Sequence, residues 1–226
     1  MLAQSRNNRT NSLAIEKLSS QLQELVLEIQ SQTKQPALID DIIRYTQSVI
    51  STMHRLDNFW RDIDVFAWEA TSGPAYARSI DLADSAFPKH RQILAVSAKG
   101  GTKPLTKVSV QDALQAVARN RQNCWYQLGS KLHVKTTWEH NELIIALLSK
   151  PDFSDLSKFH SWIAEEHPHL VIDAVSAMIY ADTGQSDKQS AATTRVELLH
   201  KPELFREQLY NTEMEILTSD VLAQYE

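Results

Sequence analysis

Glycine is scarce in this sequence, at 5 of 226 residues. Large antiparallel sheets need glycine-rich turns, and loops that bind dinucleotides or phosphates need glycines at fixed offsets. The scarcity therefore argues against a β-sandwich, a Rossmann domain and a P-loop enzyme. Because 42% of the residues are hydrophobic, the chain still has enough apolar side chains for a folded core.

The first apolar pattern follows a polar stretch at 1–11, which we interpret as a flexible arm. The pattern consists of Ile15, Leu18, Leu22, Leu25 and Ile29, alternately three and four positions apart. This seam of two heptads is too short for an independent coiled coil. It predicts either a helix packed on its own domain or an arm that docks on a neighbouring copy of the chain.

The strongest helical pattern runs over 38–60, where apolar residues repeat three or four positions apart. We expect this helix to continue to Ala70, because Gly73 and Pro74 follow. Further helices are predicted over 75–86, 110–117, 125–132, 136–148, 154–166, 168–182 and 202–223, with a polar, mobile stretch at 183–194.

These patterns predict an all-α fold with two helical lobes, 12–98 and 108–226, joined by a basic linker at 99–107. Residues 92–110 are the least helical part and predict either one small β-hairpin or a loop. Ser109, with Asp112 three residues later, predicts an N-terminal helix cap.

Positive charge is concentrated in the middle of the chain. Residues 89–135 hold nine Lys and Arg and a single acid, Asp112, which gives this segment a net charge of +8. The residues before it carry −3 and those after it −10, so the whole chain has a net charge of −5. A phosphate backbone attracts such cations and releases its counterions to them, and a nearby carboxylate would weaken each contact.

Aromatic rings among these cations point to single-stranded nucleic acid, because bases stack on them. Trp125 shares an apolar stripe with Leu128 and Leu132 and is predicted to lie in the core, whereas Tyr126 is on another face and is the better candidate for stacking. The predicted nucleic-acid-binding residues are Lys99, Lys103, Lys107, Arg119, Arg121, Tyr126, Lys131 and Lys135.

The sequence thus predicts a non-enzymatic protein that binds single-stranded nucleic acid or RNA and self-assembles along the strand, as a homo-oligomer or as a subunit of a larger complex. Residues 1–29 would supply the contacts between copies. The main alternative is an adaptor or scaffold whose basic segment pairs with an acidic partner protein, or with the acidic C-terminal part of the chain itself.

A catalytic alternative rests on Arg195 and His200, whose spacing resembles the Arg-x4–6-His motif of HEPN-type ribonucleases, which are also all-helical. The resemblance implies that two protomers bring their pairs together. About one such match is expected by chance from the Arg and His content. Val196 also departs from the polar residue that often follows the arginine in such sites.

No metal or other cofactor is predicted, because the histidines form no pair at i, i+4 and Cys124 is the only cysteine. The longest apolar run, Leu143 to Leu148, is far too short to span a membrane, and the first residues do not resemble a signal peptide. We therefore expect a cytoplasmic protein with no membrane partner.

Overall fold

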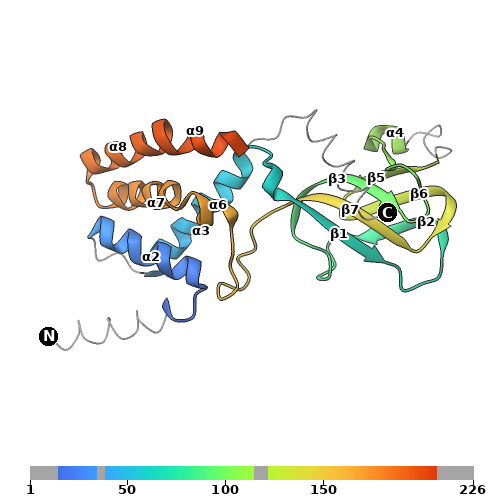
Figure 1. The fold of residues 1–226 in the computed structure, drawn as a ribbon, viewed down its shortest axis with the longest axis horizontal. Helices are drawn as coiled ribbons and strands as arrows, with labels where there is room; N and C mark the ends of the chain where they lie inside the picture. The colour runs from blue at the N-terminus through green and yellow to red at the C-terminus, as the bar shows by residue number, and fades with distance from the viewer. Residues whose placement is uncertain (1–14, 35–38, 115–121, 208–226) are drawn as a thin grey trace. The chain divides into compact units, whose positions relative to one another are not determined.

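The computed structural model describes residues 15–34, 39–114 and 122–207. The chain divides into two compact units, which Figure 1 draws as a bundle of helices and a group of strands. The helical unit comprises the described residues up to Arg61 and those from Lys150 onward, and the β unit comprises those from Asp62 to Ser149. The β unit is therefore inserted between two halves of the helical unit. The fold is α+β, and the prediction of an all-α fold with two helical lobes is wrong.

The helical unit is built from short and medium helices. Its elements are α2 (Ser20–Thr33), α3 (Ile39–Leu56), α6 (Trp162–Glu166), α7 (Pro168–Asp182), α8 (Ser186–Arg195), the π-helical turn η2 (Val196–His200), α9 (Lys201–Leu204) and the 3-10 turn η3 (Phe205–Glu207). Helix α2 is capped by Ser19, whose hydroxyl accepts a hydrogen bond from the backbone N–H of Leu22.

The apolar seam of α2 packs inside the helical unit. Leu22, Leu25 and Ile29 are buried there in one core with side chains of α3 and α7. Helix α7 contacts α2, α3 and α8, and Val171 and Val175 are among its many fully buried residues. The seam is thus a core surface rather than a docking surface for another copy. The arm at 1–11 lies outside the described residues.

The β unit contains two sheets around a shared core. Its elements are the 3-10 turn η1 (Trp60–Asp62) at its start, β1 (Ile63–Glu69), β2 (Ala75–Asp81), β3 (His90–Ala98), β4 (Thr106–Lys107), α4 (Val110–Leu114), β5 (Cys124–Leu128), β6 (Lys131–His140) and β7 (Glu142–Ser149). One sheet has the order β1-β7-β3 and the other β2-β6-β5-β4, and β4 and β5 form the parallel pair. The β unit begins and ends on neighbouring strands, because Ile63 of β1 pairs with Leu148 of β7.

The core of the β unit is formed by side chains from both sheets. Ile93 and Ile145 come from one sheet, and Ile80, Leu132 and Val134 come from the other. Four of the five glycines of the chain lie in connections between its strands: Gly73 after β1, Gly100 and Gly101 after β3, and Gly129 after β5. Gly129, at a φ of 60°, is the one glycine between β5 and β6. The glycine scarcity argued against a β-sandwich, yet the β unit packs two sheets around one core with these few glycines.

Strands replace several predicted helices. The predicted extension of the second helix is β1, the predicted helix over 75–86 is largely β2, and the helices over 125–132 and 136–148 are β5, β6 and β7. Strands β3 and β4 occupy 92–110 but belong to different sheets, so they form no hairpin. The polar stretch at 183–194 is mostly helix α8.

Other predicted elements are present. Helix α7 has the predicted bounds, and α3 covers most of the predicted segment. The hydroxyl of Ser109 accepts the backbone N–H of Asp112 at 3.1 Å, so the predicted cap of α4 is confirmed. Across the described ranges, no helix combines the length and apolar character needed to cross a membrane.

Candidate functional site

One face of the four-stranded sheet points away from the core of the β unit. Along β6, Leu132 and Val134 are buried while Lys131 is exposed and His133 and Lys135 are half-buried. Successive side chains of a strand point to opposite faces, so these last three residues share the outer face.

Tyr126 lies on the same outer face. It is the register partner of His133, and the two rings stack with their centroids 4.8 Å apart and their planes 15° apart. Flat rings on a sheet surface are platforms on which single-stranded bases stack. The sequence prediction included Tyr126 but missed His133. The alternation of buried and polar residues from Lys131 onward was the signal that could have revealed it.

Two lysines flank this stacked pair along β6. Lys131 forms no ion pair with any described residue, although its register partner on β2 is the exposed Asp81. Lys135 lies two residues beyond His133, beside Ala77 of β2. The outer face therefore combines two cations with two stacked rings, and strand pairing brings Asp81 beside Lys131.

Other predicted residues lie elsewhere. Lys107 of β4 pairs with Trp125 of β5, and its Nζ lies 5.2 Å from the centroid of that buried indole. Because register partners point to the same side, Lys107 is on the opposite side of the sheet from Tyr126. The prediction that Trp125 is a core residue is confirmed.

Lys99 is engaged in an ion pair. Its Nζ donates to a carboxylate oxygen of Glu142 at 2.6 Å, and this hydrogen bond raises the pKa of Lys99. Lys103 is exposed in the loop between β3 and β4, and Arg119 and Arg121 lie outside the described residues. Of the predicted residues, the structure thus brings Tyr126, Lys131 and Lys135 onto one face.

A second polar cluster lies in the helical unit, around the buried carboxylate of Asp173 on α7. Arg195 donates to both carboxylate oxygens, from Nε at 2.9 Å and from Nη2 at 2.6 Å. The Nε2 of His200 lies 3.0 Å from Oδ2, and Gln32 donates to Oδ1 at 2.8 Å. The structure thus brings Arg195 and His200 together through Asp173, a residue that the sequence prediction of this pair did not include.

The ionisation of Asp173 reflects this environment. Burial by itself would raise the pKa of its carboxyl group, but the hydrogen bonds from Arg195, Gln32 and His200 outweigh burial and lower the pKa to about 2. The hydrogen bond to Asp173 raises the pKa of Arg195. Asp173 and Arg195 are therefore a permanently charged pair at neutral pH.

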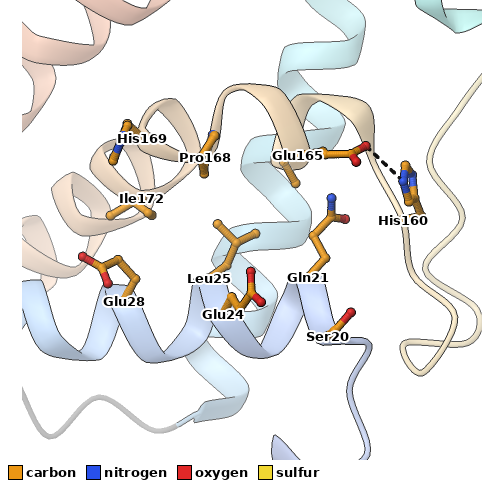
Figure 2. A pocket seen from close by; sticks show the side chains of 11 residues that line it. Ser20, Gln21, Glu24, Leu25, Glu28, His160, Glu165, Pro168, His169 and Ile172 are labelled. Carbon is orange, nitrogen blue, oxygen red and sulfur yellow. Dashed lines mark ion pairs between the residues drawn. The ribbon is translucent and has the colours of Figure 1, made fainter.

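A cavity of about 500 Å³ adjoins this cluster, between α2 and the α6–α7 segment. Figure 2 shows Glu24 and Glu28 projecting from α2 on one side of it, and His160 paired with Glu165 on the other, at 3.2 Å. His169 lines the cavity and stacks on His200 of the Asp173 cluster, with ring centroids 6.4 Å apart. In the described part of the chain, no group of His, Cys, Asp and Glu has the arrangement of a metal site.

The chain matches no protein-family model, and its sequence matches no curated protein.

Proposed function

We propose that this protein binds single-stranded nucleic acid, and RNA in particular, without cleaving it, on the outer face of the sheet β2-β6-β5-β4. The observation that carries the proposal is the stacked pair of Tyr126 and His133 between Lys131 and Lys135. Phosphate groups bind cations, and unpaired bases stack on flat rings. This face offers both, on residues 131–135 of β6 and on Tyr126 of the neighbouring strand β5.

Each residue of this face would have a separate role. Lys131 and Lys135 would each contact a phosphate, and their contacts would set the register of the strand without reading its sequence. Tyr126 and His133 would accept a base on the exposed side of their stack, which every base can use because every base has a flat face. The protein would therefore discriminate weakly between sequences.

The salt dependence of binding tests this proposal. We expect the double variant Lys131→Gln/Lys135→Gln to bind a fluorescein-labelled oligouridine more weakly than the wild type. For the loss of two phosphate contacts, the slope of log affinity against log salt should fall by about 1.4, at about 0.7 per contact. Fluorescence anisotropy over a series of salt concentrations measures both quantities.

Lys107→Gln is the matched control, because this exposed lysine is on a strand of the same sheet but on its other side. The control should keep the wild-type slope. If the double variant kept the affinity and the slope of the wild type, the outer face would not be the binding surface.

A second candidate function is RNA cleavage, and the shared carboxylate of Asp173 favours it. The carboxylate orients His200 through Nε2, which leaves Nδ1 to exchange a proton with a substrate, and Arg195 places a positive charge beside it. Under this hypothesis, His200→Ala eliminates cleavage of the oligouridine and leaves its affinity unchanged. Cleavage at the wild-type rate by this variant would remove the hypothesis.

The proposal keeps the expected cytoplasmic location and assembly with other copies or other subunits. The buried seam of α2 no longer supports self-assembly, so contacts between copies would have to use another surface. Light scattering with and without oligouridine measures whether the nucleic acid brings copies together.

A further inference from the structure

A cavity of about 250 Å³ lies in the β unit, where β1, β2 and the chain between β2 and β3 meet. Ten residues line it, and six of them are of two kinds. Three are aromatic (Phe66, Trp68 and Phe87) and three are carboxylates (Glu69, Asp81 and Asp84). Among the described residues, no lysine or arginine lines this cavity.

The aromatic walls are set at an angle to one another. The rings of Phe66 and Phe87 lie 5.0 Å apart with their planes at 69°, and Phe87 is almost fully buried. Trp68 already faces a cation, because the guanidinium carbon of Arg78 lies 5.8 Å from the centroid of its ring. That guanidinium group is held by the backbone oxygen of His140 and does not line the cavity.

Two of the three carboxylates accept hydrogen bonds from the backbone. One oxygen of Asp81 accepts the N–H of Ala83 and one oxygen of Asp84 accepts the N–H of Ala86, both at 3.0 Å. Glu69, Asp81 and Asp84 form no ion pair with any described residue. The three carboxylates therefore have no ion pair within the described chain, but two of them act near a lysine: Glu69 interacts electrostatically with Lys99, and Asp81 is the register partner of Lys131.

From this combination we propose that the cavity binds a methylated ammonium headgroup, as in choline or a trimethylated lysine side chain. Aromatic faces attract cations, most strongly when the cation loses little hydration on binding. Methyl groups reduce the hydration that the ammonium loses on binding, and they pack against aromatic rings. An unmethylated ammonium or a metal ion would bind more strongly to a site lined by oxygen atoms alone. The cavity is large enough to hold such a headgroup.

The test titrates choline chloride into the full chain at constant ionic strength and follows the indole N–H signals by NMR. We expect saturable shifts of the Trp68 signal, which Trp68→Phe identifies by its loss. The neutral isostere 3,3-dimethylbutanol should bind at least tenfold more weakly. Equal binding of the isostere, or no saturation with choline, would overturn the proposal.

Two variants locate the site. Asp84→Asn and Trp68→Phe, which both keep the size or flatness of the side chain, should each weaken choline binding severalfold. Tyr76→Ala is the matched control, because Tyr76 is an exposed aromatic residue of β2 that does not line the cavity. Wild-type affinity in both cavity variants would refute the assignment.

The two sources of the headgroup are separated by comparing choline with N-acetyl-trimethyllysine amide, with N-acetyl-lysine amide as the control for methylation. Tighter binding of the trimethyllysine compound would identify a modified protein as the source, and tighter binding of choline would identify a free or lipid-borne headgroup. Equal binding of the methylated and unmethylated lysine compounds would contradict the proposal.

Discussion

Arg195 binds Asp173 through two parallel hydrogen bonds, one to each carboxylate oxygen. This bidentate geometry fixes the orientation of both side chains and joins the end of α8 to the middle of α7. His200 and Gln32 donate to the same carboxylate, so the contact ties together segments that lie far apart in the sequence.

Asp173→Asn should destabilise the helical unit by about 1–3 kcal/mol, because it removes hydrogen bonds to a charged acceptor. The effect should depend on pH. The pKa of Asp173 is lowered from 3.8 to about 2, so its stabilising contribution is complete above pH 3.8 and is lost as the pH falls toward 2. When the pH is lowered from about 5 to about 2, the free energy of unfolding should therefore fall less in the variant than in the wild type. Urea denaturation at each pH measures both. An identical pH dependence in both proteins would contradict the ionic role of Asp173.

Tyr126→Ala should weaken RNA binding by about 1–3 kcal/mol, the usual contribution of one stacked base. Tyr126→Phe keeps the flat ring and should retain the wild-type affinity. Anisotropy with the labelled oligouridine measures both variants. An acidic partner protein would bind through the lysines alone, so equal affinity of Tyr126→Ala and wild type for the RNA would favour the adaptor hypothesis.

Gly101→Ala should destabilise the β unit by about 1–3 kcal/mol through overpacking. A Cβ atom at position 101 would lie 2.6 Å from Cζ2 of Trp138, and that indole cannot move freely because its Nε1 donates to the carbonyl oxygen of Lys99 at 3.0 Å. Gly73→Ala is the control, since a Cβ there meets no atom within 4 Å. Urea denaturation followed by tryptophan fluorescence compares the two, and equal stabilities would show that Trp138 can shift.

His140 should titrate below its usual range. Burial lowers the pKa of its imidazole, a hydrogen bond with the backbone of Trp138 raises it, and the nearby charge of Arg78 lowers it again, with a net decrease from 6.5. The contribution of the neutral, buried His140 to the stability of the β unit is therefore fully present above pH 6.5. It declines as the pH falls below 6.5, because the imidazole takes up a proton more readily in the unfolded chain than in the folded one. NMR titration of the His140 ring measures this pKa, and a value of 6.5 or above would contradict the burial.

A clear one-sided pattern predicted helix α2. Leu22, Leu25 and Ile29 fit a period of 3.6 and no other, and they are in α2. The spacing of Leu128 and Leu132 imitated a helical stripe, but a turn at Gly129 separates them, so Leu128 ends β5 exposed and Leu132 is buried in β6. The run from Leu143 to Leu148 has no period, because both faces of β7 are buried, and such a run indicates neither structure.

Part of the candidate site could be predicted from the sequence, because the directions of neighbouring side chains follow simple rules. Trp125 and Tyr126 are neighbours in sequence, and neighbours point in different directions in a helix and in a strand, so the assignment of one to the core and the other to the surface did not depend on the fold. The grouping of the lysines did depend on it. Lys107 and Lys131 are separated to opposite sides by strand pairing, which composition alone does not specify.

The pairing of Ile63 with Leu148 has a consequence for how the chain assembles during synthesis. A ribosome releases α2 and α3 long before α7, the helix against which both of them pack. The strand-rich insertion is contiguous, so it can complete its own fold in the interval. The two ends of the insertion lie on adjacent strands. This keeps α2 and α3 close to the newly made α7 and reduces the entropic cost of packing these helices together.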